Sequence, residues 1–259
     1  MAYQENVWEF EDSIEHEIHF MGRYGAKGEK RAARIHATPE QIRKQNQVQR
    51  EKRLRRTIKA NFKKNDLWLT LKYPAGTKKT IDEVKHDLRN FLSRLKRRYK
   101  KHDEELKFIY RIEIGSRGGV HCHMIVNRIR DTQTDVLIQD AWTEGRVNYE
   151  SLYDQGGFDD LAKYLVKEPK PGAAEETEKL SPKDRKKIFA YSSSRNLIRP
   201  IPKKKFFKRR TLRKMIEAGI TPRTGFYIVK DTVRGGINPF TGTSWLSYTE
   251  EKIKKTRMQ

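Results

Sequence analysis

The sequence has little cysteine and no long hydrophobic run. Cys122 is its only cysteine, so no disulfide can form within the chain, which fits a reducing cytoplasm. No stretch approaches the roughly 20 apolar residues that a membrane-spanning helix needs. The N-terminal segment is acidic and lacks a cationic start followed by an apolar run, so it does not resemble a signal peptide. These absences predict a cytoplasmic protein without a membrane partner.

Acidic residues are also scarce beside the basic ones. Lysine and arginine total 57, aspartate and glutamate total 34, and the formal net charge is +23. A charge of this size predicts a polyanionic partner. Nucleic acid is the first candidate, because basic side chains that neutralise phosphates release counterions. Two clusters are candidate phosphate contacts: Arg53, Arg55 and Arg56 in the N-terminal part, and Lys203, Lys204, Lys205, Arg209 and Arg210 in the C-terminal part.

Composition divides the chain into three regions, which we treat as candidate domains. A basic N-terminal extension covers residues 1–63, a central region with clear periodic patterns covers 64–170, and a basic C-terminal region covers 171–259. The C-terminal region begins with the linker-like segment PGAAEETEKLSPKD. We expect the central region to be the functional domain.

The two outer regions contain a few recognisable elements. In the first, Thr38-Pro39-Glu40-Gln41 is typical of a helix start. The basic helix that follows has a narrow apolar stripe of Leu54, Ile58 and Phe62. In the C-terminal region the sequence predicts a short helix over about 209–218, a strand over 225–235 and a turn-rich tail.

The central region alternates between strand and helix patterns. Strands are expected over 66–74, 107–114, 120–127 and 146–153, because apolar and polar residues alternate there. Helices are expected after a capping box at Thr80–Glu83, over 131–142, and over 158–168. The order β-α-β-β-α-β with one extra helix predicts an α+β, ferredoxin-like fold, an antiparallel sheet with helices on one face and the other face open.

Two histidines share one face of the strand VHCHMIVN. Residues two apart on a strand point to the same side, so His121 and His123 lie together while Cys122 points into the core. If the GSRGG loop places Ile114 opposite Val120, then Glu113 lies opposite His121 and Arg111 lies opposite His123. Cross-strand partners have Cβ atoms roughly 4.5–5.5 Å apart, so these side chains form one cluster.

The cluster is a candidate metal site. Two imidazoles and the Glu113 carboxylate can hold a divalent cation and leave positions for substrate oxygens, and Mg²⁺ and Mn²⁺ are both plausible. Arg111, on the same face, is a candidate DNA contact. The other interpretation is that the histidine pair is incidental.

Tyr164 and Lys167 lie on the polar face of the expected helix over 158–168. A tyrosine hydroxyl can act as a nucleophile and form a covalent intermediate. A metal ion that polarises a phosphate oxygen is its natural electrophilic partner. By itself, Tyr-x-x-Lys on a polar face is also compatible with an ordinary surface pair.

Three motifs in this order resemble those of the HUH endonucleases. They are WLTLKY (68–73), the histidine motif VHCHMIV and the Tyr164-x-x-Lys167 motif. Within that superfamily the chain is most similar to rolling-circle replication initiators with a single catalytic tyrosine, of the phage and plasmid type. Glu113 lies where such proteins often carry a third metal ligand.

The resemblance implies a metal-dependent nicking and joining reaction on single-stranded DNA at a replication origin, in a bacterial host cell. Tyr164 would attack a phosphodiester and become linked to the 5′-phosphate, and Lys167 would lie near that phosphate. The chain lacks the G-x-x-x-x-G-K-[ST] motif of a helicase domain. A host helicase and a host polymerase are therefore implied as partners.

Two alternatives stay open at this stage. A related HUH transposase or conjugative relaxase would use the same chemistry in another biological setting. A non-catalytic protein that binds single-stranded nucleic acid on the open face of a ferredoxin-like sheet is the second alternative. In that case the histidines would only contact the ligand, and Tyr164 would be a surface residue.

Overall fold

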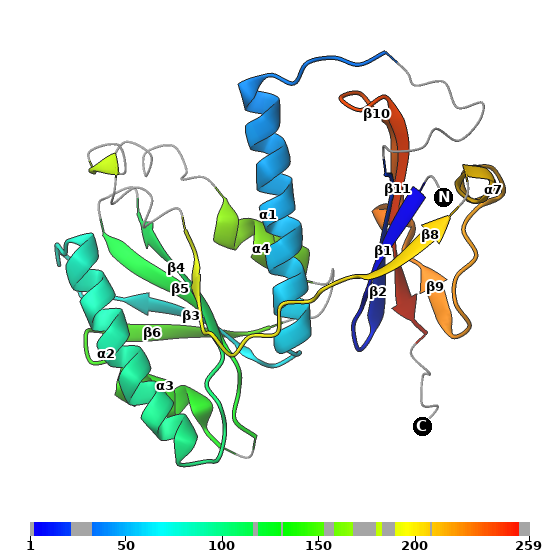
Figure 1. Cartoon of the computed structure of the whole chain (residues 1–259). Coiled ribbons are helices and arrows are strands. Elements are labelled where there is room, and N and C mark those ends of the chain that lie inside the picture. Colours follow the sequence, from blue (N-terminus) through cyan, green and yellow to red (C-terminus); the bar gives the residue numbers. More distant parts are fainter. Residues whose placement is uncertain are drawn as a thin grey trace. The chain divides into compact units, whose positions relative to one another are not determined.

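The computed structural model describes residues 3–21, 33–115, 119–130, 132–152, 158–167, 180–182, 190–207 and 209–253. This part of the chain contains five α-helices and eleven β-strands, arranged in antiparallel sheets (Figure 1). It confirms the predicted α+β class. No helix in these ranges is long and apolar enough to cross a membrane.

Two compact units divide the chain. One comprises Met1–Lys44 and Pro200–Gln259, and the other comprises Gln45–Arg199. These units differ from the three regions expected from composition. The physical reason is that strands from the two chain ends pair with each other in the first unit, while most of the N-terminal helix packs in the second.

The sheet of the second unit has the predicted ferredoxin-like order. Its strands run β6-β3-β5-β4-β7, and all neighbours are antiparallel. The first four match the predicted strands to within two residues at most ends, and β7 is an additional edge strand. The bounds are β3 Leu67–Lys72, β4 Phe108–Ile114, β5 Val120–Val126, β6 Arg146–Ser151 and β7 Ser192–Ser193.

One face of this sheet is covered by α2 (Ile81–Lys100) and α3 (Thr134–Ala141). Alternate residues of the strands, including Leu69, Cys122 and Met124, form a core with both helices. Cys122 is 2% exposed, and burial raises the pKa of its thiol. The cysteine is therefore a packing residue, as predicted.

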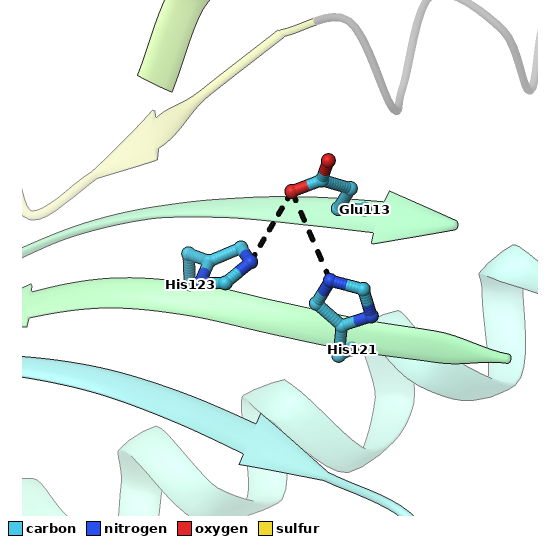
Figure 2. A group of neighbouring side chains, drawn as sticks. All are labelled: Glu113, His121 and His123. Carbon is cyan, nitrogen blue, oxygen red and sulfur yellow. Dashed lines mark ion pairs between the residues drawn. The ribbon is translucent and has the colours of Figure 1, made fainter. Parts of the chain in front are cut away.

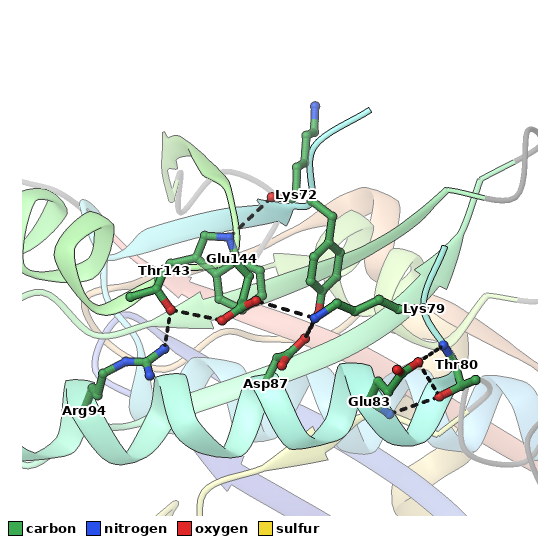
Figure 3. A network of polar contacts seen from close by, with 10 residues as sticks. Lys72, Lys79, Thr80, Glu83, Asp87, Arg94, Thr143 and Glu144 are labelled. Atoms are coloured by element: carbon green, nitrogen blue, oxygen red, sulfur yellow. Dashed lines mark hydrogen bonds and ion pairs between the residues drawn. The ribbon is translucent and has the colours of Figure 1, made fainter. Parts of the chain in front are cut away.

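A polar network fastens α2 to the strand and helix beside it (Figure 3). The predicted capping box is present: the Thr80 hydroxyl accepts the Glu83 N–H, and the Glu83 carboxylate accepts the Thr80 N–H. Asp87 accepts hydrogen bonds from Tyr73 at 2.9 Å and from Lys79 at 2.5 Å. Because Tyr73 follows β3 directly, this network sets the start of the helix against the end of that strand.

The opposite face of the sheet is not open, which corrects the expectation of helices on one face only. The helices α1 (Pro39–Asn61) and α4 (Asp159–Val166) pack there against Ile109 of β4 and Ile125 of β5. The apolar stripe of α1 does this, since Leu54, Ile58 and Phe62 are 0%, 0% and 3% exposed. A stripe of that width was enough to bury the helix.

α1 and α4 are also joined by polar contacts. The Gln47 amide donates to the Val166 carbonyl at 2.7 Å, and Arg55 forms an ion pair of 2.6 Å with Asp159. Arg55 is therefore committed to α4, and Arg56 is 8% exposed. The assignment of these two arginines to DNA needs correction, because the face of α1 that carries them packs on the protein. Arg53 is exposed.

The first unit contains a six-stranded sheet that the sequence patterns did not predict. The strands run β10-β11-β2-β1-β8, with β9 also paired to β11. Charged residues at core-facing positions, such as Glu5 and His16, hide the alternation that predicts a strand. The bounds are β1 Tyr3–Glu9, β2 Ser13–Phe20, β8 Lys203–Phe207, β9 Phe226–Ile228, β10 Arg234–Asn238 and β11 Thr243–Lys252.

The predictions for the C-terminal region hold in part. The short helix is present as α7 (Arg209–Ala218). The strand expected over 225–235 is broken by a 3-10 turn at Lys230–Thr232, where the Thr232 hydroxyl donates to the Val229 carbonyl at 2.7 Å. The tail expected to be turn-rich contains β11.

Candidate metal and nucleophile site

Glu113 on β4 and the two histidines on β5 occupy the register predicted from the hairpin. Glu113 lies opposite His121, and Arg111 lies opposite His123. The Gly115 N–H donates to the Gly119 carbonyl at 2.8 Å and closes the hairpin, while Ser116 to Gly118 lie outside the described residues. The alternation of the strands therefore puts the three candidate ligands on one face.

The three side chains converge on a single carboxylate oxygen (Figure 2). Glu113 Oε2 lies 3.8 Å from His121 Nε2 and 3.2 Å from His123 Nε2. One ligand atom from each residue lies within 4.8 Å of the others. Two imidazole nitrogens and one carboxylate in this arrangement fit a divalent cation that keeps open positions.

The orientation of His123 is set by β3, which the sequence patterns did not assign to the site. The Thr70 hydroxyl lies 3.2 Å from His123 Nδ1, so Nε2 is the nitrogen turned toward Glu113. The Trp68 ring stacks on His123, with centroids 5.4 Å apart and planes 11° apart. Contacts of this kind orient a ligand from outside the first coordination shell. The pairing of β3 with β5, which places Thr70 beside His123, was the missing information.

Tyr164 points its hydroxyl into the ligand cluster. The hydroxyl donates to Glu113 Oε2 at 2.7 Å and lies 2.8 Å from His123 Nε2. The ring meets Trp68 edge-on, with centroids 5.6 Å apart. Tyr164 is therefore not an isolated surface residue, although the sequence motif alone allowed that interpretation.

Lys167 lies at the C-terminal end of α4, beside the same two residues. Its ammonium nitrogen is 3.2 Å from Glu113 Oε1 and 3.4 Å from the centroid of the Tyr164 ring. A cation at this distance from an aromatic face is attracted by the ring and favours negative charge on it. The spacing of three residues between Tyr164 and Lys167 brings both to the carboxylate.

The charges of the site follow from these contacts. Burial alone raises the pKa of a carboxyl, but hydrogen bonds from both imidazoles and Tyr164, and the Lys167 charge, hold the pKa of Glu113 well below its usual range. Burial lowers the pKa of His123, so its ring is neutral at pH 7. The site therefore offers an anionic oxygen and a neutral imidazole, the protonation states that bind a cation.

Arg111 shares the face of the ligands but is not available to DNA, which corrects its assignment. Its side chain is among the most deeply buried in the protein, at 1% exposed, and Nη1 donates to the Tyr164 and Leu165 carbonyls. A buried guanidinium has no surface with which to contact a phosphate.

The predicted C-terminal DNA contacts lie in the first unit. Lys203, Lys204 and Lys205 are exposed on β8, which pairs with β1, and Lys203 forms an ion pair with Glu9. The backbone of Arg209 and Arg210 lies in the first turn of α7, and their side chains are outside the described residues. A role of these residues and of Arg53 in binding DNA stays a prediction.

Residues 66–169 match the model of a family described as replication-associated protein ORF2. The match supports a replication initiator family. The matched segment is less than half of the chain, but it contains β3 to β6, α2 to α4 and all five residues of the candidate site. No curated protein and no solved structure is similar enough to the chain to count as a match.

Proposed function

We propose that this protein is a metal-dependent, site-specific endonuclease and DNA-joining enzyme that acts on single-stranded DNA at a replication origin. The observation that carries the proposal is the position of the Tyr164 hydroxyl, within hydrogen-bond distance of two candidate ligands of one metal site. The family match of residues 66–169, the segment that contains the site, supports a role in replication.

Tyr164 is the proposed nucleophile. Its oxygen forms a bond to phosphorus, the bond between phosphorus and the 3′-oxygen breaks, and the 5′-phosphate stays on the tyrosine as a phosphotyrosine. Attack of a 3′-hydroxyl on this phosphotyrosine reverses the step and joins the strand. The energy of the phosphodiester is kept in the covalent intermediate, so joining needs no ATP.

The tyrosine needs help to lose its proton. Burial and the hydrogen bond to ionised Glu113 raise the pKa of Tyr164 above its ordinary value. Lys167, 3.4 Å from the ring centroid, opposes this effect because its charge favours the phenolate. The side chain of Tyr164 is only half-buried, so a phosphate group can approach its oxygen.

Glu113, His121 and His123 would hold the divalent cation, with Mg²⁺ and Mn²⁺ both compatible with this donor set. A bound cation supplies Lewis-acid stabilisation of the charge that develops on the phosphate oxygens. The Thr70 hydroxyl keeps His123 Nε2 directed at the site, and Trp68 prevents the imidazole from turning.

Covalent adduct formation tests the proposal. The protein is incubated with Mn²⁺ and single-stranded oligonucleotides tiled over the replicon that encodes it, and adducts are detected on a denaturing gel. We expect an adduct with the wild type and none with Tyr164→Phe, because the variant lacks the attacking oxygen.

Tyr149→Phe is the matched control. The Tyr149 hydroxyl donates to the Asp135 carbonyl at 2.9 Å, and the side chain packs with the core on the helical face of the sheet. This variant should form the adduct at the wild-type rate. An adduct that persists in Tyr164→Phe would reject Tyr164 as nucleophile, and DNA binding without any adduct would favour the non-catalytic alternative.

A further inference from the structure

Arg111 is a buried cation that contacts the end of the helix carrying Tyr164. The side chain is 1% exposed, and Nη1 lies 3.3 Å from the Tyr164 carbonyl and 3.2 Å from the Leu165 carbonyl. Both acceptors belong to the last turn of α4, which ends at Val166. The contact therefore joins the middle of β4 to the last turn of α4.

The end of α4 requires such a partner. The last four carbonyls of a helix have no donor within the helix, and buried ones must find a donor elsewhere. Lys167 leaves the helix with φ −58° and ψ 154°, so no left-handed residue closes the turn. Arg111 supplies donors to two of these carbonyls, and its positive charge complements the negative end of the helix.

The arrangement is expensive in stability. Burial lowers the pKa of Arg111, and Glu113 nearby opposes that effect. Within the described residues, the buried Nε atom of Arg111 has no hydrogen-bond partner. An apolar side chain of similar volume often stabilises such a position as well or better. A guanidinium here therefore points to a requirement other than folding stability.

We propose that Arg111 is a positioning residue that holds Tyr164 in register with the metal ligands. The inference rests on the proposed role of Tyr164 as nucleophile. The strand β4 holds this tyrosine at both ends, since Arg111 binds its carbonyl and Glu113 accepts a hydrogen bond from its hydroxyl at 2.7 Å. The two residues are two positions apart on β4 and so lie on the same face.

This geometry makes the distance between the tyrosine oxygen and the ligands depend on the last turn of α4. Without Arg111, that turn is anchored only by packing of residues such as Leu165 and by the Gln47 contact to Val166. A displacement of the nucleophile by about 1 Å costs on the order of 100-fold in rate. The ligands on β4 and β5 would stay in place.

The test compares Arg111→Met with Ile109→Ala. Methionine keeps the volume and removes the donors, while Ile109 is a fully buried residue on the same face of β4 that contacts neither the ligands nor the Tyr164 carbonyl. Three quantities are measured in the full-length protein: the single-turnover rate of adduct formation, the DNA concentration at half-saturation, and the affinity for Mn²⁺.

We expect Arg111→Met to lower the single-turnover rate by about 10- to 100-fold, with DNA half-saturation and Mn²⁺ affinity within about twofold of the wild type. Ile109→Ala should lower the melting temperature and leave the rate within about threefold. The inference is overturned if Arg111→Met keeps the wild-type rate. It is equally overturned if the Mn²⁺ affinity falls in parallel, or if Ile109→Ala loses the same rate.

Hydrogen exchange separates this inference from the proposed function. Arg111→Met should speed amide exchange over residues 163–167 and leave the exchange of α2 unchanged. If the wild type forms no adduct, the proposed function fails, and the exchange result still decides whether Arg111 holds the turn. Unchanged exchange over 163–167 would show that it does not.

Discussion

At the level of single residues, the site depends on side chains that act on more than one neighbour. Glu113 contacts both histidines, Tyr164 and Lys167 through its two oxygens. Each of these contacts favours the ionised carboxylate, which explains why its pKa is low despite burial. A residue with so many partners in one site is expected to tolerate no substitution.

Removal of one imidazole should separate metal binding from folding. We predict that His121→Ala lowers the affinity for Mn²⁺ by more than about tenfold, because loss of a ligand costs at least as much as loss of an outer-shell partner. Isothermal titration gives the affinity directly. His121 is 25% exposed, so its loss should change the melting temperature of the metal-free protein little.

His102→Ala is the control for this experiment. His102 is exposed in the loop after α2 and is not part of the ligand cluster. It should bind Mn²⁺ as the wild type does. Equal affinities for the wild type and His121→Ala would contradict the metal site.

At the level of secondary-structure elements, the helices that surround the site have different origins of stability. The capping box and the regular apolar spacing of α2 are visible in its own sequence, and both are present in the structure. The apolar stripe of α1 is narrow and its surface strongly basic, so it suggested a phosphate-binding arm. The structure buries that stripe against Ile109 and Ile125.

The N-cap of α2 should contribute measurably to stability. We predict that Thr80→Ala lowers the free energy of unfolding by about 1 kcal/mol, because the Glu83 N–H loses its acceptor and the capping box is broken. Urea denaturation measures the change. Ser93→Ala, at an exposed position inside the same helix, should be neutral or slightly stabilising. Equal stability of Thr80→Ala and the wild type would show that the cap contributes nothing.

At the level of the whole molecule, the net charge of +23 is the dominant feature. Part of the basic surface is used within the protein, as the burial of Arg111 and Arg56 demonstrates. The exposed lysines of β8 belong to a sheet formed by the two ends of the chain. Their candidate partner is the phosphate backbone of single-stranded DNA.

Binding of single-stranded DNA should weaken steeply with salt. Each phosphate contact contributes about 0.7 to the slope of log affinity against log salt concentration. We predict that Lys204→Ala combined with Lys205→Ala reduces the slope by about 1.4. Fluorescence anisotropy at several salt concentrations measures it.

A matched pair on α2, Lys96→Ala with Lys100→Ala, removes the same charge from exposed positions outside the predicted cluster. Its slope should stay close to that of the wild type. A larger loss of slope in this control than in the β8 variant would place the DNA elsewhere on the molecule.

Local sequence was sufficient for the sheet that carries the site and for its candidate ligands. Strands β3 to β6 and helix α2 follow from periodicity and caps. The register of Glu113 opposite His121 follows from alternation and a short turn, because the two residues are joined by a hairpin. Tyr164 required only its motif and its place after the histidine strand.

Tertiary contacts over long sequence distances determined the rest. The sheet of the first unit pairs β1 with β8 and β2 with β11, and its core-facing Glu5 and His16 are bound to each other, so no local pattern predicts the strands. The roles of Thr70 and Arg111 likewise depend on which strand and helix pack beside them. Periodicity in a chain reports which face of an element is buried, but the partner that buries it is selected by the packing of the whole fold.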